Sequence, residues 1–189
     1  MKKRIFVASL LIVAVLIGMT GGPVFAKKPL TILTFDEIPY QSVDGLNFNG
    51  VTFGFQIGGV PSLDAYYHEG GPGQITYVQD PSLQGNTAGT LTLTFDQPTT
   101  VVEFGVALNT DASLPAGATV DLHRPGAGLL RQSIALATSP NPTFTEGLFS
   151  YSGPAVKTVV ITFDSASTGH FALDNLKFHQ GKHRKHLGN

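Results

Sequence analysis

Apolar and polar residues alternate with a period of two along most of the chain after residue 29, as in strands that bury one face. The clearest case is TLTLTF at residues 90–95, where Leu91, Leu93 and Phe95 share one face. Residues 101–108 repeat the pattern. Further strands are predicted at residues 30–36, 51–57, 75–79, 118–123, 129–137, 156–163 and 171–178, and residues 144–151 form a strand or an ordered loop.

The segment at residues 171–178 contains a change of face. Phe171 and Leu173 share one parity, whereas Leu176 and Phe178 share the other. A strand keeps its faces unless a residue is inserted, so a β-bulge is predicted at Asp174 and the asparagine after it. The carboxylate there lies between two apolar pairs and needs backbone donors or a cation as partners.

Glycine and proline separate the predicted strands. The chain contains 22 glycines and 12 prolines, and no stretch beyond the N-terminal segment keeps a helical period. Short strands with such punctuation predict an all-β fold. We expect a two-sheet antiparallel β-sandwich of jelly-roll topology over residues 29–178.

The N-terminal 26 residues have the order of a secretory signal peptide. A basic start is followed by an apolar run and by small residues before Ala26. The run is shorter than the roughly 20 residues that span a membrane, so the mature chain is expected to be secreted without a span. Cysteine is absent, which excludes disulfides. Residues 179–189 form a basic, His-rich tail that we expect to be flexible.

Charge is unevenly distributed and limits the ligands. Between residues 29 and 176 there are 13 acidic residues and three basic ones, Arg124, Arg131 and Lys157. An acidic body disfavours nucleic acid and anionic polysaccharides as partners, because it cannot neutralise phosphates or acidic groups. It is compatible with bound cations.

The best candidate for ligand contact is the segment at residues 64–69, predicted to be a loop. Tyr66 and Tyr67 offer ring faces that stack on sugars, and Asp64 and His68 offer hydrogen bonds. The alternative is an ordered loop whose tyrosines cover the edge of the sandwich. The chain has no tryptophan, the usual large stacking residue, which weakens the sugar-binding interpretation.

Motifs for catalysis do not emerge from the sequence. His68 is followed by glutamate and then by Gly-Gly-Pro, which breaks a helix, and the second histidine of a zinc motif is missing. No nucleophile elbow or phosphate-binding loop is found. The sequence therefore favours a protein that is not an enzyme.

Several short motifs carry a family resemblance. They are TFD in the first strand, TLTLTFDQP, VVEFGVAL, TVDLH, and ITFDS with FALDNLKF at the end. Together they resemble the jelly-roll domains of bacterial secreted proteins, similar to carbohydrate-binding modules and to exosortase-sorted (PEP-CTERM type) extracellular proteins. The C-terminal Pro-Glu-Pro signal and apolar helix of the latter are missing, so anchoring by that route is not expected.

The resemblance implies a structural calcium ion shared by the first and last strands. Asp36 and its neighbour Glu37 match the first position, and Asp174 matches the second. Calcium takes six to eight oxygen ligands, and nearby carboxylates repel unless a cation or proton lies between them. The alternative is that Asp36 caps a turn while Asp174 accepts backbone N–H groups.

These observations favour a secreted, non-catalytic module that binds neutral carbohydrate or a cell-envelope glycan and holds a structural Ca²⁺. The first alternative is a structural or adhesive extracellular matrix protein with no small-molecule ligand. A small lyase or hydrolase on the same scaffold is the least supported possibility.

Overall fold

The computed structural model describes residues 29–37, 39–68, 70–126 and 128–179, and in these residues every regular element is a β-strand. The predicted signal peptide and the tail after His179 lie outside the described residues. Eleven strands pair in antiparallel fashion into one hydrogen-bonded sheet. They are β1 (Leu30–Leu33), β2 (Asn47–Phe48), β3 (Val51–Ile57), β4 (Val60–Pro61), β5 (Ala65–His68), β6 (Ser82–Asn86), β7 (Gly89–Leu108), β8 (Leu114–His123), β9 (Leu130–Asn141), β10 (Phe144–Phe163) and β11 (His170–His179).

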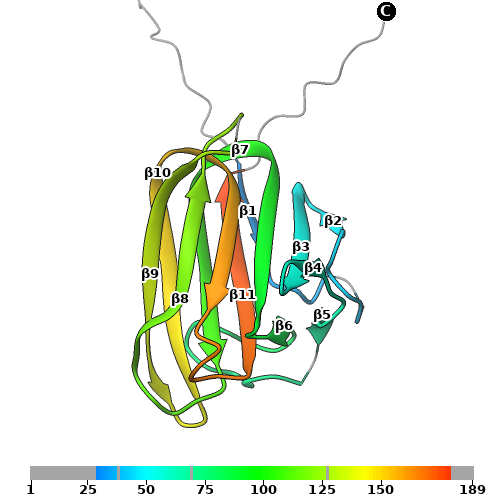
Figure 1. Cartoon of the computed structure of the whole chain (residues 1–189). Helices are drawn as coiled ribbons and strands as arrows, with labels where there is room; N and C mark the ends of the chain where they lie inside the picture. The colour runs from blue at the N-terminus through cyan, green and yellow to red at the C-terminus, as the bar shows by residue number, and fades with distance from the viewer. Residues whose placement is uncertain (1–28, 38, 69, 127, 180–189) are drawn as a thin grey trace, which may run out of the picture.

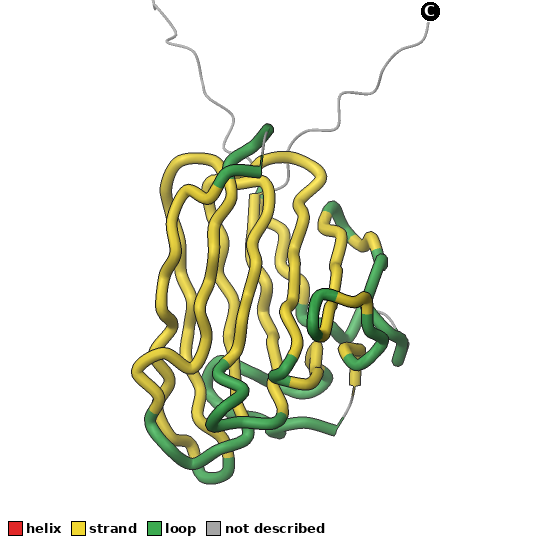
Figure 2. Tube along the Cα trace, in the orientation of Figure 1, coloured by secondary structure: helices red, strands yellow, loops and turns green. Residues whose placement is uncertain are grey.

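The sheet folds over on itself into two layers because β7 and β10 pass from one layer to the other (Figures 1 and 2). Residues 89–95 of β7 pair with β3, whereas residues 102–108 pair with β11. β10 follows the same path, with register shifts on either side of Val156. The first layer therefore contains β3 and β8, and the second contains β5, β6 and β11.

Aromatic rings fill the space between the layers. Phe163 from the first layer stacks on Phe171 from the second with ring centroids 4.0 Å apart. Phe95 meets Phe178 at 4.9 Å. All four rings are at most 4% exposed, so the alternating apolar positions of both layers form one core.

The predicted all-β antiparallel sandwich is confirmed, and the pairing is consistent with a jelly roll. The predicted separation of residues 90–95 and 101–108 into two strands is wrong, because β7 continues as a bent strand through residues 96–100. Residues 144–151 and 156–163 likewise join in β10. The sequence suggested breaks because Gly, Pro and polar residues mark turns, yet they also occur where a strand bends between layers.

The predicted bulge in the last strand is confirmed. The pairing of β11 with β7 shifts register between Asp174 and Lys177. Asn175 lies in the left-handed region with φ of 55°, a conformation that asparagine tolerates better than most residues. The bulge turns Leu176 and Phe178 back into the core, where each is at most 1% exposed.

Residues 70–81, which we call the covering segment, cross the outer face of the second layer. Val78 packs on Ala107 and Ala172 in a small second core. Gly105 allows the close approach, since a Cβ there would lie 2.1 Å from the carbonyl oxygen of Tyr77. The strand predicted at residues 75–79 is therefore wrong, because its apolar side chains pack on the sheet from outside rather than within it.

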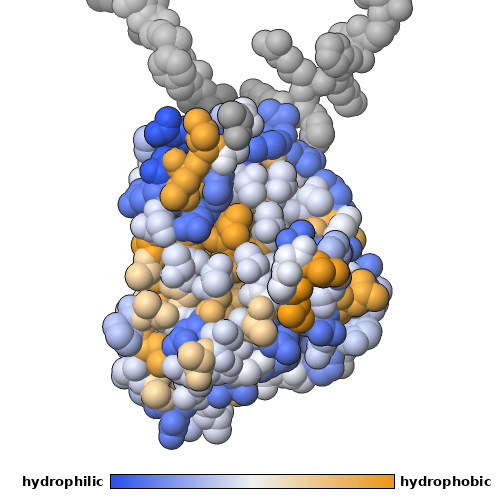
Figure 3. Space-filling model, viewed as in Figure 1, coloured by the Kyte–Doolittle hydropathy of each residue, from blue (hydrophilic) through white to orange (hydrophobic). Residues whose placement is uncertain are grey.

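Exposed hydrophobic side chains are separated on the face shown in Figure 3. Among the aliphatic residues, Leu63 (71% exposed) follows β4, Val60 (65%) lies in β4, and Leu129 (62%) precedes β9. Apolar residues scattered in this way are ordinary for a protein surface. Across the described ranges, no helix has the length and hydropathy to cross a membrane.

Candidate functional site: an acidic groove beside an aromatic cluster

The predicted ligand-contact loop is in fact the strand β5, which pairs with β6. Successive side chains of a strand point to opposite faces. Tyr66 therefore faces outward, whereas Tyr67 is only 2% exposed and packs against Phe35 and Phe53. The prediction that both tyrosines stack on a ligand is wrong for Tyr67, because its ring belongs to the core. Asp64 is exposed just before β5.

Tyr40, Tyr66 and His68 form a cluster of three rings at the edge of the second layer, which we call the aromatic cluster. Their centroids lie 5.3 Å (Tyr40–Tyr66), 5.6 Å (Tyr40–His68) and 5.4 Å (Tyr66–His68) apart. Tyr40 is 68% exposed. Sequence reasoning missed it, because a single tyrosine in the irregular stretch after the first strand belongs to no periodic pattern.

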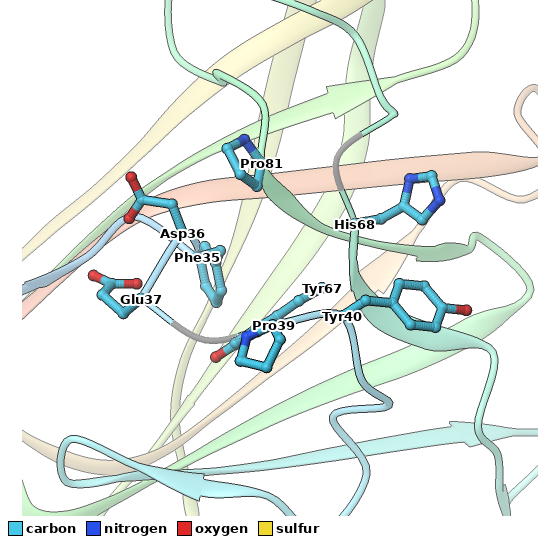
Figure 4. Close-up of a pocket in the computed structure, with 8 residues that line it drawn as sticks. All are labelled: Phe35, Asp36, Glu37, Pro39, Tyr40, Tyr67, His68 and Pro81. Carbon is cyan, nitrogen blue, oxygen red and sulfur yellow. The ribbon is translucent and has the colours of Figure 1, made fainter.

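A groove of about 350 Å³ runs beside this cluster. Figure 4 shows Asp36 and Glu37 on one side of the groove and Tyr40 and His68 on the other, with Tyr67 between them. Its volume falls within the usual range for small-ligand sites. The lining residues are Phe35, Asp36, Glu37, Pro39, Tyr40, Tyr67, His68 and Pro81.

The turn after β1 places the two acids at the groove. Phe35 adopts the left-handed conformation with φ of 59° and is fully buried. Its ring packs 5.1 Å from Tyr67, and this packing holds a conformation that costs roughly 1–3 kcal/mol for a bulky residue. The Thr34 N–H donates to Glu37 Oε1 at 2.9 Å, and the Thr34 hydroxyl donates to Asp36. The backbone N–H of this turn is therefore capped by Glu37, whereas Asp36 accepts only the side-chain hydroxyl.

The hydroxyl of Tyr67 is buried at the groove without a hydrogen-bond partner among the described residues. In Figure 4 it lies beside Pro39, on the side of the groove that Glu37 borders. Burial, and secondarily the negative charge of Glu37, raise the pKa of Tyr67 above its ordinary value. The phenol is therefore a neutral, unsatisfied donor. A buried polar group in that state costs about 1–3 kcal/mol.

A second cavity of about 290 Å³ shares Asp36 and Pro81 with the groove. It also contains Asp80 and Asp174. Asp36 and Asp174 come together because β1 pairs with β11, with Leu33 opposite Leu176. The first and last strands are therefore adjacent, as expected. Glu37 lines the groove and not the second cavity.

Asp174 is 2% exposed and already has backbone partners. It accepts hydrogen bonds from the N–H groups of Gln79 at 2.9 Å and Asn175 at 2.6 Å. The pKa of Asp174 is raised to about 6, mainly by burial. Those two hydrogen bonds oppose the rise, and the charges of Asp36 and Glu37 add to it. A carboxyl group in this state gains from any cation that approaches it.

The predicted calcium ligands are only partly gathered. Within the part of the chain that the structure describes, no three His, Cys, Asp or Glu side chains are placed to share a metal ion. Asp80, which was not predicted, lines the same cavity as Asp174. Its Oδ2 accepts the N–H groups of Gly71 and Gly73 at 3.0 and 2.8 Å.

No family model and no curated protein matches the chain. Among solved structures it is similar to a carbohydrate-binding module of family 29, with 10% identity, a TM-score of 0.42, and coverage of 82% of this chain and 91% of that chain. A family 29 variant complexed with mannohexaose gives 11% identity, a TM-score of 0.42, and 82% and 94% coverage.

Proposed function

We propose that this protein is a secreted, non-catalytic carbohydrate-binding module whose site is the aromatic cluster and the groove beside it. The observation that carries the proposal is the contact of three rings within 5.6 Å of one another, with Tyr40 68% exposed, next to two carboxylates. Ring faces bind the apolar side of a sugar, and carboxylates accept hydrogen bonds from its hydroxyl groups.

The position of the two acids supports binding rather than hydrolysis. Asp36 and Glu37 lie on the same side of the groove (Figure 4). Glycoside hydrolysis commonly needs two carboxyl groups that flank the scissile bond. The groove offers carboxylates on one side only, which suits recognition of a ligand that is not cleaved.

The test is binding to a panel of soluble glycans by isothermal titration calorimetry. Tyr40→Ala and Tyr66→Ala are each expected to weaken binding by about 0.5–1.5 kcal/mol, with little change in the melting temperature. Tyr77→Ala is the matched control, because Tyr77 is 38% exposed but lies outside the cluster. Failure to bind any glycan would favour the structural or adhesive alternative.

We also propose that a calcium ion binds at the cavity that contains Asp36 and Asp174. The pairing of β1 with β11 and the raised pKa of Asp174 support it, since a cation would relieve the repulsion between these acids. A ligand that binds only the folded state at a hundredfold excess over Kd stabilises it by about 2.7 kcal/mol. Calcium should therefore raise the melting temperature relative to chelator.

Two variants sharpen the calcium test. Asp174→Asn should erase the response, and Asp121→Asn should retain it, because Asp121 lies on β8 in the first layer. Identical melting curves in calcium and in chelator would contradict the proposed calcium site.

Secretion is the remaining part of the proposal. Removal of residues 1–26 would leave Lys27 as the mature N-terminus. Mass spectrometry of the extracellular fraction tests this, and an intact Met1 there would contradict it.

A further inference from the structure

The groove carries negative charge that no cation of the protein offsets among the described residues. The only ion pair among the described residues joins Lys177 to Glu103 at 2.6 Å, and neither residue lines the groove. No lysine or arginine is among the lining residues. Glu37 has one oxygen engaged by Thr34. A neutral sugar would leave this charge uncompensated, whereas a cationic group would be attracted to it.

The opposite side of the groove suits an organic cation rather than a metal ion. Tyr40 and His68 present rings there, and Tyr66 completes the cluster. An ammonium group is attracted to aromatic faces, and tyrosine is among the rings that bind it. Calcium requires six to eight oxygen ligands, which rings do not provide.

A third feature is independent of both the acids and the exposed rings. The Tyr67 hydroxyl is buried at the groove and has no partner among the described residues. Natural proteins satisfy most buried polar groups, so an unsatisfied one beside a groove indicates a contact that a ligand completes. A phenol both donates and accepts, and can bond an amine or a sugar hydroxyl.

We propose that the glycan bound at this groove contains amino sugars with free, protonated amines, held between Glu37 and the aromatic cluster with the Tyr67 hydroxyl as a further partner. This inference rests on the proposed function and replaces the expectation of a neutral ligand. It names a chemical class, oligosaccharides of glucosamine with free amines, rather than their N-acetylated or neutral counterparts.

The experiment compares two hexamers that have the same linkage and length but differ in charge. Glucosamine hexamer and N-acetylglucosamine hexamer are titrated into the mature protein by calorimetry in chelator, at low and high salt. We expect at least tenfold tighter binding of the glucosamine hexamer at low salt, with the difference shrinking as salt rises.

A matched pair of variants separates the groove from the general acidity of the protein. Glu37→Gln and Asp121→Asn remove the same charge, but Asp121 lies on β8 in the first layer. Glu37→Gln should abolish most of the preference for the glucosamine hexamer, and Asp121→Asn should leave it intact. A preference that survives in Glu37→Gln would overturn the inference.

Tyr67→Phe tests the role of the Tyr67 hydroxyl without disturbing the packing of the core. It keeps the ring that packs on Phe35 and Phe53 and removes an unsatisfied hydroxyl, so the melting temperature should not fall. Affinity for the glucosamine hexamer should drop severalfold. Unchanged affinity would overturn the role of the hydroxyl.

The outcomes distinguish the two proposals. Equal or tighter binding of the N-acetylated hexamer would overturn the inference that the ligand carries free amines. It would still support a carbohydrate-binding module. Binding of neither hexamer, nor of any glycan in the panel, overturns both.

Discussion

The covering segment is attached at two nearby points by buried carboxylates whose pKa values shift in opposite directions. At one attachment, Glu146 of β10 accepts the N–H groups of Thr76 and Tyr77 at 3.1 and 2.7 Å. At the other, Asp174 of β11 accepts the N–H of Gln79 at 2.9 Å. Both acids are nearly inaccessible, with exposed fractions of 6% and 2%, yet their pKa values move in opposite directions.

Their surroundings explain the difference. Burial by itself would raise the pKa of Glu146, but hydrogen bonds from Tyr77, Asn141 and Thr76 outweigh it and hold that pKa below its ordinary value. Asp174 also accepts hydrogen bonds, but its burial outweighs them, and two further acids, Asp36 and Glu37, add to the rise of its pKa. Burial alone therefore does not set the charge state of a carboxyl group. Neighbouring donors and charges decide it.

The comparison separates two kinds of region. Around Glu146 the polar network is satisfied and serves to fix the covering segment on the sheet. Around Asp174 the network contains unrelieved negative charge, and it borders the groove through Asp36. Unrelieved charge beside a groove is typical of binding sites.

The largest expected effect comes from removing the satisfied carboxylate. Glu146→Ala leaves the N–H groups of Thr76 and Tyr77 without their acceptor, at about 1–3 kcal/mol each. We expect about 4 kcal/mol of lost stability in urea unfolding. Loss of less than about 1 kcal/mol would show that water replaces the carboxylate and that the attachment is not structural.

The second prediction uses the opposite pKa shifts, measured in chelator. The folded-state pKa of Asp174, about 6, exceeds its ordinary value of 3.8, so the folded state binds the proton more tightly. The contribution of Asp174 to stability therefore rises as pH falls from 7 toward 4, by up to about 3 kcal/mol at about 1.36 kcal/mol per pKa unit.

Glu146 has the reverse sign. Its folded-state pKa is lowered from 4.5, so its contribution is present above that value and is lost as pH falls further. For Asp174, urea unfolding at pH 4 to 7 should show that the free energy of unfolding of the wild type increases as pH falls. The Asp174→Asn variant should lack this increase. The same pH dependence in both proteins would refute the assignment.

The smallest effect is expected at the half-exposed ion pair of Glu103 and Lys177. Glu103 and Lys177 have side chains that are 28% and 34% exposed, so solvent already screens their attraction. Glu103→Gln should cost less than about 1 kcal/mol. A cost near that of Glu146→Ala would break the contrast between exposed and buried carboxylates that underlies the other two predictions.

Hydrophobic alternation alone predicted most of the long strands, the sandwich and the bulge. Alternation such as TLTLTF leaves a strand only one way to bury its leucines, and the change of face around Asp174 requires an inserted residue. These are local properties of the backbone. They need no knowledge of which strands become neighbours. Tyr66 and Tyr67 were predicted to lie in one loop because the four residues of β5 are too few to show a clear alternation.

Which side chains share a site depends on how the layers fold together. Tyr40 joins Tyr66 and His68 because the chain after β1 returns to the edge of β5, where Ser42 pairs with Tyr66. Glu146 meets Thr76 across 70 residues of sequence. Such contacts depend on how layers fold over and on what covers them. Hydrophobic periodicity fixes which face of a strand is buried, but it does not specify the partner that buries it.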